Sequence, residues 1–358
     1  MMDPLIQYAT AEDGVRIAFW TLGEGPPLVY MVGGPWNHIE LWEAEECRDW
    51  YERLSKNHTL VRYDLRGTGH SERGVSDYSI EAQMRDLRAV TDALGLKTFD
   101  LLAAADSGPV AIAYTVANPE RSSHLILWCT WPRGPGITGS ERIRAWQSLI
   151  DKDWELMTDT CAHLCFGWSG GEIGRRSAQH LRESVTHDDA RRALKATGAF
   201  DVTALLSEVR TSTLVIHRRE IPWLPVRVAE SLAAGIEGAR LTLLEGEWIA
   251  PYLGDSDAAA KAIGDFLGVE GEPDSRDSDR LQAAADAGTD STAPSESLTK
   301  REVEVLRLVA SGSTNNEIAG DLVLSVRTVE RHIGNIYAKI GARGRADATA
   351  YALTRNLV

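Results

Sequence analysis

The chain has 358 residues, of which 43% are hydrophobic and 25% charged, and this balance excludes a largely disordered protein. Its formal net charge is −14, which by itself argues against nucleic acid as a partner. The charge is unevenly distributed, however, because residues 298–358 carry +3 and leave −17 for residues 1–297. All 11 tryptophans lie between Trp20 and Trp248. These two asymmetries indicate two parts with different functions.

The cysteines do not indicate a disulfide framework, because a chain of this length would need more than Cys47, Cys129, Cys161 and Cys165. Cys161 and Cys165 have no second His/Cys pair at zinc-ligand spacing, so we expect buried thiols, no metal site and no other cofactor. The N-terminal residues have no signal-peptide pattern, and no window of about 18 residues is continuously apolar. We therefore expect a cytoplasmic protein with no membrane partner.

Residues 1–270 alternate short apolar runs with amphipathic segments. The predicted strands are Val15–Trp20, Pro27–Val32, Thr59–Tyr63, Phe99–Ala103, Leu125–Cys129, Thr213–His217 and Arg240–Leu244. The predicted helices between them are Leu41–Leu54, Ile80–Leu94, Gly108–Ala117, Val226–Gly235 and Asp257–Leu267. This alternation predicts an α/β domain with a mostly parallel sheet that helices cover on both faces.

Two segments interrupt this rhythm. Residues 132–209 contain the helical stretches Glu141–Leu164, Gly171–Glu183 and Asp188–Leu194. We interpret them as a helical lid over the carboxyl ends of the strands, where α/β sheets bind their ligands. Residues 271–297 are rich in Asp, Ser, Ala, Thr and Gly and have almost no large apolar residue, which predicts a flexible acidic linker.

Three segments of the first part carry a resemblance to a known family. Val29–Trp36 (VYMVGGPW), Asp64–Ser71 (DLRGTGHS) and Leu101–Tyr114 (LLAAADSGPVAIAY) resemble the oxyanion loop, the Asp-x-Arg-Gly-x-Gly-x-Ser turn and the strand–elbow–helix segment of the α/β-hydrolases. Asn118–Arg121 (NPER) follows, as is typical of that family. The resemblance covers about Asp13–Leu267 and implies an α/β-hydrolase fold with a helical lid.

The catalytic residues of that family are missing from the pattern. The elbow normally reads Gly-x-Ser-x-Gly, and the corresponding positions 103–107 place Ala105 where the nucleophile stands. HRREIPWLP places Ile221 at the position of the acid, and GEWIAPYLGD places Ile249 at the position of the base. A triad needs nucleophile, base and acid within hydrogen-bond reach of one another. We therefore expect a domain that is not an enzyme.

Two neighbours of Ala105 offer alternative nucleophiles. Asp106 would serve if the elbow were shifted by one residue, but counting along the strand does not favour that register. No histidine lies between His217 and His332 to help resolve the resulting ester. Ser107 has no base either. For both residues, capping or supporting the following helix is the simpler interpretation.

Tryptophans on separate loops are expected to converge over the elbow and to line a ligand site there. The predicted ligand-binding residues are Gly33, Gly34, Trp36, His38, Ala105, Asp106, Trp131, Trp223, Trp248 and Ile249. Aromatic walls with a few polar groups suit a small apolar or aromatic effector. The alternatives are that these rings belong to the ordinary core, or that they fill the cavity and leave a structural scaffold.

Residues 298–358 predict a small all-α domain of four helices. The first ends at Gly312, the second runs from Thr314 or Asn315 to about Leu322, the third lies between Ser325 and Gly341, and the fourth spans Ala346–Leu353. The first helix is marked by the apolar residues Val303, Leu306, Leu308 and Val309, and the inward face of the third by Val326, Val329, His332 or Ile333, Ile336 and Ile340. Short connections of this kind are helix-turn-helix geometry.

This segment resembles the LuxR-type (GerE-type) helix-turn-helix over its whole length. The matching residues are Leu298, Thr299, Arg301, Glu302, Gly312, Asn315, Glu317, Ile318, Ala319, Thr328, Val329, His332, Asn335, Ile336, Lys339 and Ile340. The resemblance implies promoter DNA as a partner, a homodimer formed through the last helix, and a third helix that lies in the major groove.

The outward face of the third helix and its C-terminal end supply the predicted DNA-binding residues, which are Arg327, Thr328, Glu330, Arg331, His332, Asn335, Lys339 and Arg343. Glu330 and Arg331 are suited to base edges, and Asn335 to an adenine or a phosphate. The threonine, histidine, lysine and Arg343 are suited to phosphates. The alternative for each of these residues is that it lies on a solvent-exposed helix face and does not contact DNA. Gly334 has no side chain with which to read a base, and we expect ion pairs within the domain for Arg301 and Glu302.

Together these patterns predict a ligand-responsive transcription regulator. An inactive α/β-hydrolase-like domain (residues 1–270) binds a small effector and controls a LuxR-type DNA-binding domain (residues 298–358). The alternatives are an active hydrolase that uses Asp106 and is fused to a DNA-binding domain, and a scaffold domain with a filled pocket.

Overall fold

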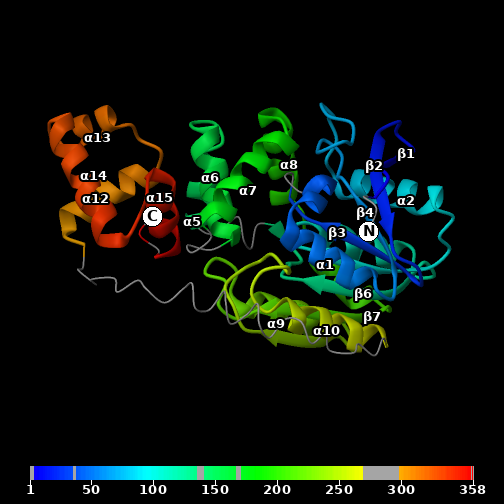
Figure 1. Ribbon diagram of the computed structural model, residues 1–358. Helices are drawn as coiled ribbons and strands as arrows, with labels where there is room; N and C mark the ends of the chain where they lie inside the picture. Colours follow the sequence, from blue (N-terminus) through cyan, green and yellow to red (C-terminus); the bar gives the residue numbers. More distant parts are fainter. Residues whose placement is uncertain are drawn as a thin grey trace.

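A computed structural model describes residues 4–34, 38–134, 141–166, 171–268, 298–355 and 357. The predicted acidic linker, residues 271–297, lies outside this described part. Figure 1 shows a twisted sheet with flanking helices, a group of lid helices beside it, and a small helical domain on the far side of the lid. No helix within the described ranges is long and apolar enough to cross a membrane.

The sheet has eight strands: β1 (Gln7–Thr10), β2 (Arg16–Leu22), β3 (Pro27–Val32), β4 (Thr59–Tyr63), β5 (Phe99–Ala104), β6 (Ser122–Trp128), β7 (Ser212–Arg218) and β8 (Arg240–Leu244). Their order is β1-β2-β4-β3-β5-β6-β7-β8. β3 to β8 pair in parallel and β1 and β2 in antiparallel fashion. The predicted mostly parallel sheet is confirmed. β1 was missed because its four residues are mostly exposed and have no apolar run.

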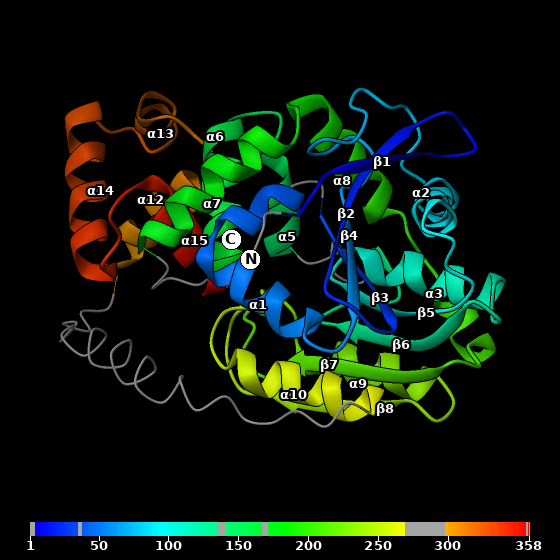
Figure 2. The same cartoon turned by 45° about the vertical axis from the view of Figure 1, so that its right-hand side comes forward.

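Helices cover both faces of this sheet, as predicted. On one face α1 (Glu45–Ser55) and α10 (Ser256–Leu267) pack into one apolar core, and on the other α2 (Ile80–Ala93), α3 (Ser107–Ala117) and α9 (Val226–Gly235) pack into a second (Figure 2). The predicted helix over Leu41–Leu54 divides into a 3-10 turn, η1 (Ile39–Glu43), and α1. The chain leaves helical geometry at Ala44, which separates them.

The lid consists of α5 (Glu141–Ser148), α6 (Trp154–Phe166), α7 (Gly171–Ser184) and α8 (His187–Gly198). The prediction of one helix over Glu141–Leu164 is wrong. After α5 the amides of Leu149 and Ile150 bond three residues back, which tightens the last turn. The Asp153 carboxylate then accepts the Leu156 amide and starts a new helix.

The C-terminal domain has the four predicted helices, α12 (Lys300–Ala310), α13 (Asn315–Asp321), α14 (Val326–Ile340) and α15 (Arg345–Thr354). α12 and α13 each begin with a capping box, Thr299 with Glu302 and Thr314 with Glu317. Gly341 ends α14 in the left-handed conformation, with φ 68°.

The inward face of α14 resolves one predicted alternative and differs from the expectation at one residue. Ile333, rather than His332, is buried with Val329 and Ile336. Val326 is 37% exposed, so its predicted inward position is wrong. Val326 is the first residue of the helix and therefore lies beyond the end of the small core formed by α12, α13 and α15.

Candidate functional site: a cavity at the sheet edge and an exposed helix

The turn between β5 and α3 has the backbone of a nucleophile elbow. Ala105 stands at its apex with φ 50°, in the left-handed region that a residue with a side chain rarely adopts. The loop after β3 is pressed against this turn, and the Gly33 amide donates to the Ala104 carbonyl at 2.9 Å. A Cβ at Gly33 would lie 2.3 Å from the Asp106 nitrogen, so only glycine allows this approach. Within this turn, Ala105 and not Asp106 stands at the apex with the positive φ.

The two other positions of the predicted triad also hold hydrocarbon side chains. Ile221, after β7, is buried. Ile249 follows β8 and lies at the edge of the same cavity as Ala105, and its carbonyl accepts a 2.6 Å hydrogen bond from the Trp128 indole. Neither side chain can accept or donate a proton.

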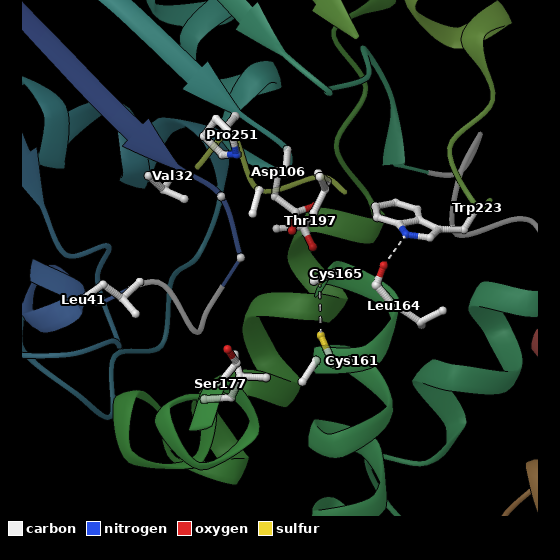
Figure 3. Close-up of a pocket in the computed structure, with 18 of the residues that line it drawn as sticks. Val32, Leu41, Asp106, Cys161, Leu164, Cys165, Ser177, Thr197, Trp223 and Pro251 are labelled. Atoms are coloured by element: carbon white, nitrogen blue, oxygen red, sulfur yellow. Dashed lines mark hydrogen bonds between the residues drawn. The ribbon is translucent and has the colours of Figure 1, made fainter. Parts of the chain in front are cut away.

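A cavity of about 170 Å³ lies between the carboxyl ends of the strands and the lid. Its volume compares with that of engineered protein cavities of ~150 Å³ that bind benzene. Figure 3 shows Val32, Asp106 and Pro251 on the sheet side and Cys161, Cys165 and Ser177 on the lid side. The indole of Trp223 closes one flank and donates to the Leu164 carbonyl on α6 at 3.1 Å.

The structure brings most of the predicted ligand-site residues together. Those that line the cavity are Gly33, Gly34, Ala105, Asp106, Trp131, Trp223 and Ile249. Trp36 lies outside the described residues. His38 and Trp248 are not among the described lining residues, so the expectation is corrected for these two.

Trp248 belongs to a loop whose backbone is held by Arg218. This buried guanidinium at the end of β7 lies over the Trp128 ring at 5.4 Å and donates to the carbonyls of Trp248 and Pro251. These bonds hold the loop that follows β8. The Trp248 indole packs against Gly254, where a Cβ would be 2.7 Å away. The ring therefore supports the loop rather than the cavity.

His38 belongs to a polar cluster with Glu40 and His70, beside the cavity-lining His180. The three ligand atoms lie within 4.8 Å of one another, and Glu40 Oε1 is 2.5 Å from His70 Nε2. However, His38 Nδ1 accepts the Glu40 amide at 3.0 Å, which leaves its proton on Nε2, the atom that faces Glu40 Oε2 at 3.5 Å. As arranged, the cluster is a hydrogen-bonded network, because Nε2 of His38 would have to lose that proton to bind a metal ion.

Several residues of the cavity were not predicted from the sequence. They are Tyr30, Tyr51, Tyr252, Trp146, Gln147, Cys161, Cys165, Ser177, His180 and Thr197. The tyrosines read as core residues of a strand, a helix and a loop, and the others lie on lid helices whose orientation the sequence does not fix. The two thiols are free, with their sulfur atoms 4.0 Å apart.

Asp106 is the acidic side chain among the described lining residues. Burial raises the pKa of its carboxyl to about 7. It occupies the N-cap position of α3, but its carboxyl makes no hydrogen bond to the helix. Of the two expected roles, capping or supporting α3, capping by the side chain is therefore wrong. Ser107 does not cap the helix either, since its hydroxyl is buried without a partner among the described residues.

A second candidate surface is the outward face of α14. Arg327, Glu330, Arg331 and Asn335 are exposed on it, and Thr328 and His332 are half-buried. In both Figure 1 and Figure 2, α14 lies on the side of the small domain away from the lid. The structure therefore leaves this face accessible to a large partner.

Two of the predicted phosphate contacts already have protein partners. Lys339 Nζ is 3.0 Å from the buried Glu302 carboxylate, and Arg343 Nε is 3.0 Å from the Asp347 carboxylate. The expected ion pairs within the domain are confirmed for Glu302 and for Arg301, whose partner is Glu304 at 2.7 Å. Lys339 thus stabilises the domain itself, independently of any contact with DNA.

The small domain docks on the lid through α15. His163 Nε2 on α6 lies 2.8 Å from Asp347 Oδ1 on α15, and both side chains are less than a tenth exposed. Burial raises the pKa of Asp347, but hydrogen bonds from His163 and Arg343 outweigh it and hold that pKa well below its usual value. Nearby, Lys152 Nζ donates to the Ser311 carbonyl at 3.0 Å. Leu353 of α15 is fully buried in the core of the larger domain.

Comparison with known proteins finds a family match within each of the two domains. Residues 26–202 match the family described as "alpha/beta hydrolase fold", and residues 296–352 match "Bacterial regulatory proteins, luxR family". The chain joins an α/β-hydrolase-fold domain to a LuxR-family DNA-binding domain. The fold predicted from the sequence is confirmed for both domains, and the second domain implies DNA binding and transcription regulation.

Relatives of the two domains have different functions. The hydrolase-fold domain is similar to the putative carbamate hydrolase RutD of Pseudomonas savastanoi pv. phaseolicola, 25% identical over 251 residues that cover 68% of this chain and 95% of that protein. The LuxR-family domain is similar to the transcriptional regulatory protein LiaR of Bacillus subtilis, 48% identical over 65 residues. That stretch covers 18% of this chain and 31% of LiaR, so the likeness concerns the DNA-binding domain alone.

Solved structures support the fold of the larger domain. A hydrolase from Pseudomonas aeruginosa PA01 has a TM-score of 0.64 at 21% identity and covers 74% of this chain and 98% of its own. The enol-lactonase from Burkholderia xenovorans LB400 has a TM-score of 0.62 at 21% identity, with 73% and 100% covered. At this identity the likeness concerns the fold and does not transfer an activity.

Proposed function

We propose that the chain is a transcription regulator in which the hydrolase-fold domain binds a small apolar or aromatic molecule and thereby controls the LuxR-family domain. The observation that carries this proposal is the position of α6. Cys161, Leu164 and Cys165 on this helix line the cavity, while His163 pairs with Asp347 of α15. Because one helix takes part in both contacts, a ligand that shifts α6 changes the docking of the DNA-binding domain directly, with no intermediate element.

We further propose that the hydrolase-fold domain does not catalyse hydrolysis. The support is the methyl group of Ala105 at the elbow apex and the hydrocarbon side chains of Ile221 and Ile249 at the other two triad positions. A nucleophile, a base and an orienting acid must all be present within hydrogen-bond reach. The cavity of about 170 Å³ favours a ligand site over a filled scaffold.

The alternative function is hydrolysis, for which two observations speak. The relatives of this domain carry hydrolase names, and the Asp106 carboxyl lines the cavity. An aspartate nucleophile would form an ester with the substrate, and a water activated by a base would then have to cleave it. His180 is the histidine among the described lining residues that offers such a base.

Ester turnover distinguishes the two functions. We expect the native protein to leave p-nitrophenyl acetate and butyrate unhydrolysed above the buffer rate. Ala105→Ser should not change this, because a serine at the apex still lacks its base and acid. Turnover by the native protein that Asp106→Ala or His180→Ala abolishes would establish the hydrolase instead.

The regulator requires specific DNA and a response to a ligand. We propose a homodimer on promoter DNA in the cytoplasm, with α14 in the major groove. Selection of binding sequences from a random library should yield a two-fold symmetric site. A ligand found by thermal shift should change the affinity for that site, since a molecule that binds one state more tightly shifts the equilibrium. Equal DNA affinity with and without a saturating ligand would exclude the control that we propose.

A further inference from the structure

The Asp106 carboxyl has no partner in the cavity that it lines. No hydrogen bond or ion pair to it is present among the described residues, and its N-cap position on α3 leaves its side chain unbonded to the helix. Desolvation is the cause of its raised pKa, with no contribution from a nearby cation. Asp106 is half-buried, and an unpaired carboxyl that is partly removed from water costs free energy. A ligand that supplies the missing partner regains part of this free energy on binding.

The walls of the cavity are aromatic and carry no compensating positive charge. Six rings line it: Tyr30, Tyr51, Trp131, Trp146, Trp223 and Tyr252. Among the described lining residues there is no lysine or arginine. The other ionisable groups that line it are His180, three of these rings (the tyrosines) and the two thiols of α6. Burial raises the pKa of the tyrosines, and the contact with Cys165 together with burial raises that of Cys161, so the tyrosines and Cys161 are neutral.

The helix end that favours a negative charge beside the cavity is already occupied. The amino end of α3, an 11-residue helix, carries the partial positive charge of the helix dipole. Asp106 stands at this end, so its own carboxylate receives that stabilisation. A ligand carboxylate placed beside it would meet a like charge with no cation to offset the repulsion. An ammonium group would instead form an ion pair with the carboxylate and cation–π interactions with the surrounding rings.

We propose that the cavity binds a small hydrophobic amine, whose ammonium group pairs with Asp106 and whose hydrocarbon part lies among the aromatic rings. This inference rests on the proposed function, since it names the effector class of the same site. The cavity volume of about 170 Å³ limits the hydrocarbon part to about one six-membered ring.

The test uses four probes of one shape with the full-length protein: benzylamine, benzyl alcohol, benzoate and toluene. We expect benzylamine to raise the melting temperature most and benzoate not at all. Asp106→Asn, which keeps the shape of the side chain, should weaken benzylamine binding at least tenfold and leave toluene binding unchanged. Toluene binding by the variant therefore also reports that its cavity is intact.

A second measurement needs no variant. At pH 7 the Asp106 carboxyl, with a pKa of about 7, is half protonated, and pairing with an ammonium ion stabilises the carboxylate. Benzylamine binding should therefore release about half a proton, measured by titration calorimetry in two buffers of different ionisation enthalpy. Benzyl alcohol and toluene should release none.

Three outcomes overturn the proposal. If benzoate or benzyl alcohol binds as tightly as benzylamine, the effector class is wrong while a ligand-controlled regulator stands. If benzylamine binds equally well to Asp106→Asn, or binds without proton release, the ammonium does not pair with Asp106. If none of the four probes binds, the cavity is not a site for ring-sized ligands, and the ligand-control part of the proposed function fails with it.

Discussion

At the scale of single residues, Ala105 combines the backbone geometry of a nucleophile elbow with a methyl side chain. Its φ of 50° is costly for a residue with a Cβ, by about 1 kcal/mol or more. In a nucleophile elbow that strain exposes a reactive side chain. Here the strain exposes a methyl group, and it is maintained by the packing of Gly33 against the turn.

Glycine at position 105 should relieve this strain. We expect Ala105→Gly to raise the free energy of unfolding by about 0.5 kcal/mol, because the gain in backbone energy exceeds the larger chain entropy of glycine in the unfolded state. Ala104→Gly is the matched control, since Ala104 lies in β5 and should lose about 1 kcal/mol. Denaturant unfolding measures both. A loss at position 105 as large as that at 104 would contradict the elbow geometry.

Asp106 should give the hydrolase-fold domain a stability that falls as the pH rises. Its folded-state pKa of about 7 exceeds the ordinary value of 3.8, so the folded protein binds more protons than the unfolded chain between these values. The burial cost is therefore absent below about pH 4, grows up to about pH 7 and is constant above that. It amounts to at most about 4 kcal/mol, because solvent in the cavity reduces it.

The variant Asp106→Asn removes this dependence. We expect it to be more stable than the native protein at pH 8 and similar to it at pH 4, with unfolding followed by circular dichroism at both pH values. Asp265→Asn, at an exposed ion pair with Lys261, is the control and should show no such trend. A difference between native and variant that does not change with pH would show that Asp106 is ionised throughout.

At the scale of secondary-structure elements, α14 combines two tasks on one helix. Its inward residues Val329, Ile333 and Ile336 hold it in the small core, and Lys339 neutralises the buried carboxylate of Glu302. Its outward residues have no such partners among the described residues, apart from Thr328, which bonds to Ser325 at the cap. Substitutions on the two sides should therefore have different effects.

Arg331→Ala and Lys339→Ala separate these tasks. Arg331→Ala should leave the melting temperature unchanged and weaken binding to a selected DNA site by about 1–3 kcal/mol. Lys339→Ala should destabilise the domain by about 2 kcal/mol, because Glu302 loses its cation. Thermal unfolding and fluorescence anisotropy distinguish the two. A destabilised Arg331→Ala, or a fully stable Lys339→Ala, would contradict this division.

The sequence predicted the elements that have a strong local pattern. β3, β4, β8 and α9 have the predicted bounds, because continuous apolar runs and helical spacing are bounded there by polar or turn residues. The break between α5 and α6 was missed because helical spacing continues across it, and it depends on the carboxylate of Asp153. The helix α14 was predictable because the residues of its pattern lie close together in the chain.

At the scale of the whole molecule, the docking of α15 on the lid connects the two domains. The resemblance to the LuxR family implies that the last helix forms the dimer on DNA. In this structure the same helix pairs with His163 and buries Leu353 in the larger domain. A helix docked in this way is less available to a second copy, so we expect docking and dimerisation to compete.

Removal of His163 should favour the undocked state. We expect His163→Ala to weaken docking by about 2 kcal/mol, since Asp347 keeps Arg343 but loses its lid partner. Amide exchange in α15 should become faster, and sedimentation should show a larger dimer fraction. Lys195→Ala, at an exposed position on α8, is the control. Unchanged protection of α15 in His163→Ala would exclude a role of this pair in docking.

By itself the sequence determined the folds of the two domains and most of their strands and helices, because these follow from local spacing and from motifs of neighbouring residues. The tertiary structure decided what the long-range contacts control. It placed Trp248 in a loop that Arg218 holds, brought Tyr30, Tyr51 and Tyr252 into the cavity, and placed α15 against α6. Such contacts join residues far apart in the chain, and the pattern of neither partner alone specifies them. The charge of the C-terminal domain illustrates the same difference. Residues 298–358 carry a net charge of +3, which can be counted from the sequence. Only the tertiary structure shows that Lys339 and Arg343 form ion pairs with carboxylates of their own domain.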